Sequence, residues 1–452
     1  MLRVASYESA IVPYTTPRER VSHRICMKIF LENVRSFAGA HEIPTKPLTI
    51  IVGENSSGKT TFLSMLSAMF SPESQFPSRP AFNEPPYDLG SYDTIATFKG
   101  GKYGRARRFS LGYEDPEKDE HFTASYVSRV GQPTLSQIRL SRSWGNLSLT
   151  FEGTKTAIDV NIPASENEPA IEIHSERDTV LPFVNMRSFG FLIFELMSRD
   201  PSLRERPVQE MPSRLVHFCD LRSRQTSLSV APVRTKPRRT YDPISDEYQP
   251  EGEHIPILLS RFLAPGGTAR QRDALHSALD EFGRESGLFT SVKVKKLGKS
   301  PSDPFRILVA VSGPPFNLTD VGYGVSQSLP VVVQSVLAAR SRLLLLQQPE
   351  VHLHPRAQAA LGSLFVQLVN SQNRRFVIET HSDFLLDRIR QEIAKGKMPP
   401  EMVSVVFFSR RRALTRVFPL RLDEKGNVIG APATYRDFFV REETNLLLRG
   451  SE

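Results

Sequence analysis

The apolar positions in the last third of the chain alternate between two spacings. Short, almost continuous apolar runs predict strands that are buried on both faces, and longer runs with helical spacing separate them. This alternation of strand and helix is typical of a mostly parallel sheet covered by helices. The predicted strands are 343–346, 375–378 and 403–408, and the predicted helices are 325–339, 355–370 and 384–395.

The first 185 residues show a different pattern. Two β-branched strands are predicted over 28–32 and 48–52, followed by a helix over 61–70 and a loop rich in Pro, Ser, Asn and Gly over 71–92. Alternating apolar and polar positions then predict short antiparallel strands. These strands include 94–98, 109–113, 147–151 and 170–173.

The middle of the chain has mixed patterns. Helices are predicted over 181–197, 255–263 and 269–283, strands over 292–296 and 305–311, and a further strand over 416–422 that closes a hairpin. The segment 222–239 carries six Arg or Lys, no acid and two prolines. Such a segment is either a nucleic-acid contact or a flexible basic linker, and we favour the linker.

Composition narrows the class of protein. The chain has 452 residues with 39% hydrophobic and 24% charged residues, values typical of a globular protein. No apolar run reaches the roughly 18–20 residues that cross a bilayer, and two cysteines provide no disulfide framework. We therefore expect a cytoplasmic protein without a membrane partner. The charge of +9 (58 basic minus 49 acidic residues) is compatible with DNA as a partner.

The most specific motif follows the strand predicted over 48–52. Gly53, Gly58, Lys59 and Thr60 have the G-x-x-x-x-G-K-[ST] spacing of a P-loop, and the predicted helix starts directly after it. Backbone N–H groups of such a loop surround phosphates, the lysine reaches the β- and γ-phosphates, and the threonine hydroxyl binds Mg²⁺. The sequence predicts a nucleoside triphosphate site. Its predicted phosphate-binding residues are Gly53, Glu54, Asn55, Ser56, Ser57, Gly58, Lys59, Thr60 and Thr61.

Four remote motifs accompany the P-loop. The strand 343–346 ends in Gln347-Gln348-Pro349-Glu350, where a P-loop enzyme carries its Walker B carboxylate, and the strand 375–378 runs into Glu379-Thr380-His381-Ser382. A glycine-rich segment, 317–327, precedes a helix, and Arg35 lies in the motif 33–37 before the P-loop. Each motif alone has an ordinary structural explanation. Their order and spacing together make coincidence improbable.

With these motifs the chain resembles an ABC-type ATPase head, similar to SMC-like proteins and to bacterial AAA-family ATPases related to the OLD nucleases. The resemblance covers 27–70 and 270–421. It implies an α/β P-loop fold with a mostly parallel sheet, an antiparallel β subdomain and an inserted mixed α/β region. The expected organisation is an N-terminal extension (1–26), a first ATPase segment with the P-loop (27–92), an inserted region (93–255) with a basic linker (222–252), a second ATPase segment (256–421) and a C-terminal tail (422–452).

The resemblance also implies how the site is used. In this family two heads sandwich ATP and Mg²⁺, so Gly322, Gly324 and Ser326 are expected to touch the γ-phosphate bound by the partner head, and Arg35 to contribute to ATP binding. His381 is expected to contact the γ-phosphate within the chain. Gln347, Gln348, Glu350 and His381 are the catalytic candidates, and Thr60 and Gln347 the metal-side candidates.

One departure from the family pattern concerns Gln347, where relatives usually carry Asp or Glu. An amide cannot take a proton from water at neutral pH and gives Mg²⁺ no charged ligand. Two explanations stay open: a head that naturally uses ATP as a clamp, or an active ATPase in which a glutamate was replaced to trap ATP. We expect ATP binding with slow turnover, and faster turnover after Gln347→Glu.

Three functions are compatible with these residues. The first is an ATP-gated switch in DNA maintenance or anti-phage defence that forms a dimer or larger oligomer and acts through a separate effector protein. The second is a non-hydrolysing scaffold held together by ATP. The third, an OLD-type nuclease, is disfavoured, because only 71 residues (382–452) follow His381 and a TOPRIM domain needs about 100.

Overall fold

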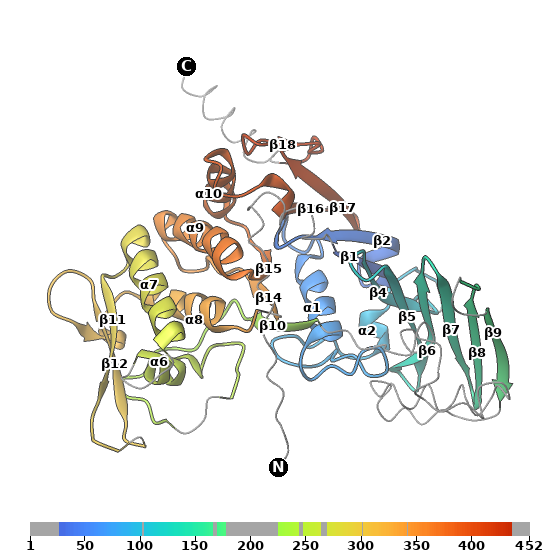
Figure 1. Ribbon diagram of the computed structural model, residues 1–452, viewed down its shortest axis with the longest axis horizontal. Coiled ribbons are helices and arrows are strands. Elements are labelled where there is room, and N and C mark those ends of the chain that lie inside the picture. Colours follow the sequence, from blue (N-terminus) through green and yellow to red (C-terminus); the bar gives the residue numbers. More distant parts are fainter. Residues whose placement is uncertain are drawn as a thin grey trace, which may run out of the picture.

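The computed structural model describes residues 27–101, 104–165, 170–177, 225–243, 247–263, 269–300, 302–340 and 342–435. The predicted N-terminal extension and the helix predicted over 181–197 lie outside these ranges. Within them, a central sheet separates an antiparallel sheet at one end from a group of helices at the other (Figure 1).

The central sheet has seven strands in the order β10-β14-β15-β3-β16-β17-β18. The first five are parallel, and β17 and β18 extend the sheet by antiparallel pairing. β15 lies between β14 and β3, the strand before the P-loop, so the carboxyl ends of these three strands meet at one edge. The strands are β10 (Thr226–Val230), β14 (Arg342–Gln347), β15 (Arg375–Glu379), β3 (Leu48–Gly53), β16 (Val403–Arg411), β17 (Leu414–Leu422) and β18 (Val428–Ile429).

The central sheet is buried on both faces, which explains the continuous apolar runs in its sequence. In β14, Leu343 and Leu345 belong to the core shared with the antiparallel sheet, whereas Leu344 and Leu346 belong to the core shared with the helices. Successive side chains of a strand point to opposite faces. Four consecutive leucines therefore supply both cores at once.

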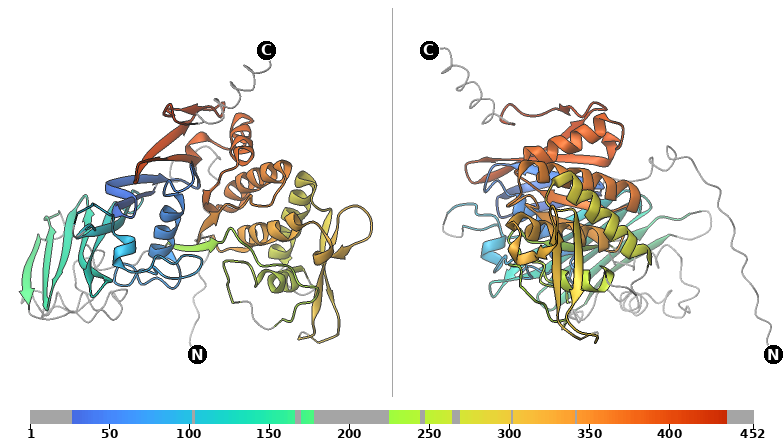
Figure 2. Two further views of the ribbon diagram at one scale, coloured as in Figure 1. Left: turned by 180° about the vertical axis from the view of Figure 1, so that it is seen from behind. Right: turned by 90° about the vertical axis from the view of Figure 1, so that its left-hand side faces the viewer.

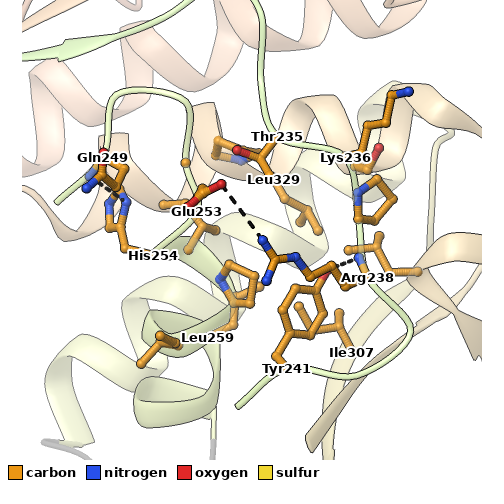
Figure 3. A pocket seen from close by; sticks show the side chains of 18 of the residues that line it. Thr235, Lys236, Arg238, Tyr241, Gln249, Glu253, His254, Leu259, Ile307 and Leu329 are labelled. Atoms are coloured by element: carbon orange, nitrogen blue, oxygen red, sulfur yellow. Dashed lines mark hydrogen bonds and ion pairs between the residues drawn. The ribbon is translucent and has the colours of Figure 1, made fainter. Parts of the chain in front are cut away.

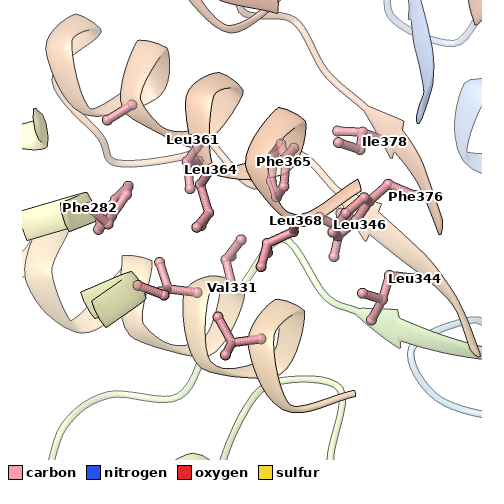
Figure 4. Packing of buried hydrophobic residues seen from close by; sticks show 14 of the residues in the cluster. Phe282, Val331, Leu344, Leu346, Leu361, Leu364, Phe365, Leu368, Phe376 and Ile378 are labelled. Carbon is pink, nitrogen blue, oxygen red and sulfur yellow. The ribbon is translucent and has the colours of Figure 1, made fainter. Parts of the chain in front are cut away.

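Helices cover the two faces of this sheet unequally. α1 (Lys59–Phe70) packs on one face, where it contacts β3, β10, β14 and β15. The opposite face is covered by a helical layer, in which Phe365 of α9 packs at 5.0 Å between ring centroids on Phe376 of β15 (Figure 4). This layer contains α6 (Ile255–Leu263), α7 (Ala269–Ser286), α8 (Tyr323–Leu337), α9 (Pro355–Gln372) and α10 (Asp383–Ala394).

The second sheet has eight antiparallel strands in the order β2-β1-β4-β5-β6-β7-β8-β9 and extends away from the helical layer (Figure 2). Its outer strands alternate buried and exposed positions, as one-sided burial requires. The strands are β1 (Met27–Val34), β2 (Phe37–Thr45), β4 (Phe109–Asp115), β5 (Glu120–Arg129), β6 (Gln132–Arg142), β7 (Gly145–Glu152), β8 (Lys155–Ile162) and β9 (Ile171–Arg177).

Smaller elements complete the described chain. A three-stranded antiparallel sheet is formed by β11 (Ser291–Lys296), β12 (Phe305–Ala310) and β13 (Phe316–Asn317). Short helices occur at α2 (Tyr92–Ile95), η3 (Leu318–Asp320) and η4 (Pro400–Met402). None of the helices in the described part of the chain is both long and apolar enough to span a membrane.

Most predicted elements are confirmed, and two expectations are wrong in the described residues. The segment 94–98 is not a strand, because α2 occupies 92–95 and only isolated bridges follow. The basic segment predicted as a linker contains β10 (Thr226–Val230), an edge strand of the central sheet, so the linker prediction is wrong for these residues. The strand β2 was not predicted; it pairs with β1, which also pairs with β4, so β1 and β2 both belong to the antiparallel sheet.

Candidate functional site

A pocket of about 480 Å³ lies at the carboxyl ends of β3 and β15 and at the start of α1. This is the edge at which parallel α/β sheets bind ligands. Its lining residues are Arg35, Ser36, Asn55, Ser56, Gly58, Lys59, Thr60, Thr61, Gln348, Glu379 and His381.

The loop from β3 to α1 depends on two glycines. Gly53 has φ +144°, and a Cβ at this position would lie 2.0 Å from the Phe408 carbonyl oxygen of β16. Gly58, at the N-cap of α1, has φ +104° and a Cβ there would lie 2.7 Å from Thr415 Oγ1. Both positions exclude a side chain, so the spacing of the two glycines is a requirement of the fold as well as of phosphate binding.

Lys59 is held inside the pocket by its own loop. Its Nζ donates to the carbonyl oxygens of Gly53 at 2.9 Å and Glu54 at 2.7 Å. Burial lowers the pKa of Lys59, and the charges of Glu379 and Glu54 oppose that shift. A partly buried ammonium group that is held in place by backbone carbonyls is suited to bind a polyphosphate.

Thr60 joins the P-loop to the two neighbouring strand ends. Its hydroxyl donates to the Glu379 carboxylate, with both oxygens at 2.9 Å, and lies 3.4 Å from Nε2 of Gln347. Burial raises the pKa of Glu379, while the hydrogen bond from Thr60 and the charge of Lys59 lower it. Glu379 belongs to a motif that the sequence singles out, but the sequence alone did not predict it as a site residue.

The turn after β14 carries the remaining catalytic candidates. Gln348 has φ +44° and donates its backbone N–H to the Glu379 carbonyl at 2.8 Å.

Glu350 is buried and does not line the pocket, and its Oε1 accepts the His381 backbone N–H at 2.8 Å. Burial raises the pKa of Glu350. Burial also lowers the pKa of His381, and the nearby Lys59 charge adds to this shift, so both effects favour the neutral imidazole.

The opposite wall comes from the turn between β1 and β2. The Arg35 backbone is fixed by a hydrogen bond to the Ile95 carbonyl at 2.7 Å. Thr415 of β17 donates its hydroxyl to Ser36 Oγ at 2.7 Å or to the Ser57 carbonyl at 2.8 Å. A single buried threonine thus fastens the turn of the antiparallel sheet to the P-loop.

The start of α8 lies outside this pocket. None of Gly322, Gly324 and Ser326 is among its lining residues; Gly322 caps α8, and Ser326 donates its hydroxyl to the Tyr323 carbonyl at 2.8 Å. Beneath them the buried Arg234 donates to the backbone carbonyls of Gln327 and Gln348, each at 3.2 Å. This guanidinium links the α8 start to the turn after β14, and burial lowers its pKa to about 10.

A separate pocket of about 330 Å³ lies beside α8 (Figure 3). Arg238 and Glu253 face each other across it at 3.9 Å, and the Arg238 backbone N–H donates to the Tyr241 hydroxyl at 2.8 Å. Ser326 lies on its wall, but no P-loop residue does.

The structure therefore collects some predicted site residues and separates others. The P-loop pocket contains the predicted residues Arg35, Asn55, Ser56, Gly58, Lys59, Thr60, Thr61, Gln348 and His381. It does not contain Gly53, Glu54, Ser57, Gln347, Glu350, Gly322, Gly324 or Ser326 among its lining residues. Ser36 and Glu379 line the pocket, although neither was predicted. Glu379 could be identified only from the strand order of the central sheet.

These groups fit a nucleoside triphosphate with Mg²⁺. The P-loop presents the start of α1 and the Lys59 ammonium, and Ser57 Oγ is buried without a hydrogen-bond partner. The hydroxyl of Thr60 and the carboxylate of Glu379 are the hard oxygen donors that Mg²⁺ prefers.

Two regions of the chain match known family models. Residues 28–166 match a family model described as "AAA domain", and residues 199–387 match one described as "AAA domain, putative AbiEii toxin, Type IV TA system". The first match contains the P-loop and the second contains the α8 start, the end of β14 and His381. A search of curated proteins found no match.

Similar solved structures include SMC heads. The SMC head bound to the C-winged-helix domain of ScpA is 11% identical at a TM-score of 0.41, over 88% of this chain and 98% of that one. The SMC head domain from Thermotoga maritima is 11% identical at 0.40, over 88% and 99%. The Pyrococcus furiosus Smc head with an extended coiled coil is 10% identical at 0.39, over 93% and 99%.

At these TM-scores the agreement with SMC heads is partial. The assignment of the fold rests on the sheet order and on the two matches to AAA domain models. Together with the pocket they define the class: an α/β P-loop ATPase-like fold in which residues 28–166 and 199–387 are similar to AAA domains.

Proposed function

We propose that this chain binds ATP and Mg²⁺ in the P-loop pocket and pairs, through the bound ATP, with a second copy of itself. The dimer or larger oligomer is a nucleotide-gated switch in bacterial DNA maintenance or anti-phage defence. One observation carries the ATP assignment: Lys59, Thr60 and Glu379 converge in a single pocket at the start of α1. ATP would be held by the P-loop residues and Arg35.

Pairing is supported by the free approach to the α8 start. A Cβ at Gly322 would have no atom within 4 Å, and the neighbouring Tyr323 is 43% exposed. The backbone of this helix start is therefore accessible to a large partner, and helix N-termini bind phosphate. In the proposed dimer, Gly322, Gly324 and Ser326 of one copy face the γ-phosphate bound by the other.

The test is the mass of the purified chain with and without Mg²⁺ and ATP, measured by light scattering. We expect a larger mass with ATP, and loss of that change in Lys59→Ala, in which ATP binds on the order of tenfold to hundredfold more weakly because a charged hydrogen bond of about 1.5–3 kcal/mol is removed. Lys425→Ala, an exposed lysine between β17 and β18, is the matched control. If the chain binds ATP without any change in mass, the proposed pairing is contradicted and the nucleotide-binding assignment stands.

A separate effector protein and DNA complete the proposal. The description of one matching family model refers to a toxin–antitoxin system, which supports a function beside another protein. For DNA, Lys293, Lys295 and Lys296 are exposed on β11, together with Lys299 just after it. Contacts of this type give binding that weakens steeply with salt. DNA affinity that stays constant between low and high salt would argue against this surface.

The scaffold alternative differs only in turnover. Gln347 lies at the end of β14, and its amide carries no charge. The switch predicts that Gln347→Glu increases ATP hydrolysis, whereas the scaffold predicts that this variant binds ATP with the same low turnover.

A further inference from the structure

We infer that Glu379, at the end of β15, supplies the carboxylate that binds Mg²⁺ beside the ATP phosphates. This inference rests on the proposed ATP site and extends it by assigning its metal-binding carboxylate to the strand between the Walker B strand and the P-loop strand. Among the described residues that line the pocket, Glu379 is the only acid.

The register of the central sheet explains how this is possible. Gln347 and Glu379 are paired residues of the parallel strands β14 and β15, so they occupy equivalent positions about 4.8 Å apart at the same sheet edge. Both reach the Thr60 hydroxyl: Gln347 from its amide nitrogen at 3.4 Å, and Glu379 from both carboxylate oxygens at 2.9 Å. The end of β14, where the acid was expected, carries the amide of Gln347, and the end of the adjacent β15 carries the carboxylate of Glu379.

The distances suit a shared metal ligand set. Mg²⁺ binds oxygen at about 2.0–2.1 Å with octahedral geometry, which places neighbouring ligands about 2.9 Å apart. The Thr60 hydroxyl oxygen and the Glu379 oxygens already have this separation. Thr60 is fixed in the first turn of α1 and Glu379 at the end of a buried strand, so both donors are positioned before the metal arrives.

The other nearby acids are less suited to this role. Glu350 is 6% exposed, and its Oε1 is occupied by the His381 backbone N–H. Glu54 is exposed on the loop, and only its backbone carbonyl contacts Lys59. Neither side chain is part of the pocket lining.

The experiment measures how much Mg²⁺ strengthens nucleotide binding. A fluorescent ATP analogue is titrated against the wild type, Glu379→Gln, Gln347→Glu and the double variant, in Mg²⁺ and in EDTA. The spectrum of Mn²⁺, by electron paramagnetic resonance in the presence of ATP, reports the metal directly. Glu392→Gln replaces another acid that is 3% exposed, outside the pocket, and serves as the control for removal of a buried carboxylate.

We expect Glu379→Gln to bind the analogue in EDTA like the wild type but to lose roughly tenfold or more of the strengthening by Mg²⁺. The bound Mn²⁺ signal should be lost in parallel, and the double variant should recover both because the carboxylate returns on β14. Strengthening by Mg²⁺ that is unchanged in Glu379→Gln would overturn the assignment while ATP binding stands. If the wild type binds no analogue under either condition, the proposed function itself fails.

Discussion

The starts of α1 and α8 are both glycine-bordered helix N-termini, yet the structure surrounds them very differently. The α1 start is enclosed by Arg35, Gln348, Glu379 and His381 in one pocket. The α8 start lies outside that pocket, with open space beside Gly322. The α1 start is thus surrounded by the chain's own residues, whereas the chain leaves open space beside Gly322 at the α8 start. The proposed sharing of a site between two copies requires such a difference.

The largest expected effect concerns the enclosed helix start. Gly53→Ala places a Cβ against the Phe408 carbonyl at a φ unfavourable for alanine, so we expect a loss of about 3–5 kcal/mol of unfolding free energy. Gly39→Ala is the control, because its φ is +77° but no atom lies within 4 Å of the added Cβ. Denaturant unfolding measures both variants. Equal losses would mean that the close contact with β16 does not constrain the P-loop.

The second effect tests the connection between the two helix starts. Arg234→Met leaves two buried backbone carbonyls without a donor, which we expect to cost about 2–4 kcal/mol of unfolding free energy. Arg238→Met, whose side chain is 68% exposed, should change stability by less than about 0.5 kcal/mol. At temperatures where Arg234→Met remains folded, ATP-dependent pairing should weaken more than ATP binding. Equal weakening of pairing and of ATP binding would mean that Arg234 does not act through the α8 start.

A smaller effect is expected at the open helix start. Gly322→Ala adds a methyl group where the chain itself has room and φ is −54°, so stability should not change measurably. In a dimer with phosphate against this backbone, the methyl group should cost about 1–3 kcal/mol, or on the order of tenfold or more in the dimer dissociation constant. Sedimentation at several protein concentrations measures it. A dimer of unchanged strength would place the interface elsewhere.

The smallest effect is a dependence on pH. Burial raises the pKa of Glu350 above its unfolded value, so at a pH between the two pKa values the folded chain holds a proton that the unfolded chain has released. The contribution of this proton to the free energy of unfolding is fully present below the unfolded pKa of 4.5. It is lost as pH rises through the folded pKa. Glu350→Gln should remove this loss, which is at most about 1.4 kcal/mol per pH unit within that window. Unfolding measured from pH 4.5 to 8 in both proteins gives the difference. Parallel curves would contradict the raised pKa.

The parallel sheet could be predicted because its strands are buried on both faces. Continuous runs such as Leu343 to Leu346 admit few other structures once their length and flanking helices are considered. β10 was missed because Thr226–Val230 alternates serine with apolar residues inside a basic segment, which has the composition of a linker. Its place as an edge strand comes from pairing with β14, which is a long-range contact.

The site was predictable only to a limited extent for a similar reason. The P-loop is local in sequence, so its residues and their positions followed from spacing alone. Glu379 lies beside Thr60 only because β15 is inserted between β14 and β3, and strand order is not encoded locally. Thr415 and Arg234 were missed likewise, since each acts on elements distant in sequence.

The fastening of the β1–β2 turn to the P-loop by Thr415 has a mechanical consequence. The same turn begins a sheet that extends from β1 through six further strands to β9, a reach on the order of 30 Å at the usual strand spacing. A rotation of the turn by about 0.1 radian would move β9 by about 3 Å if the sheet stays rigid. A small movement of the turn beside the P-loop pocket would therefore be amplified at the far end of the antiparallel sheet.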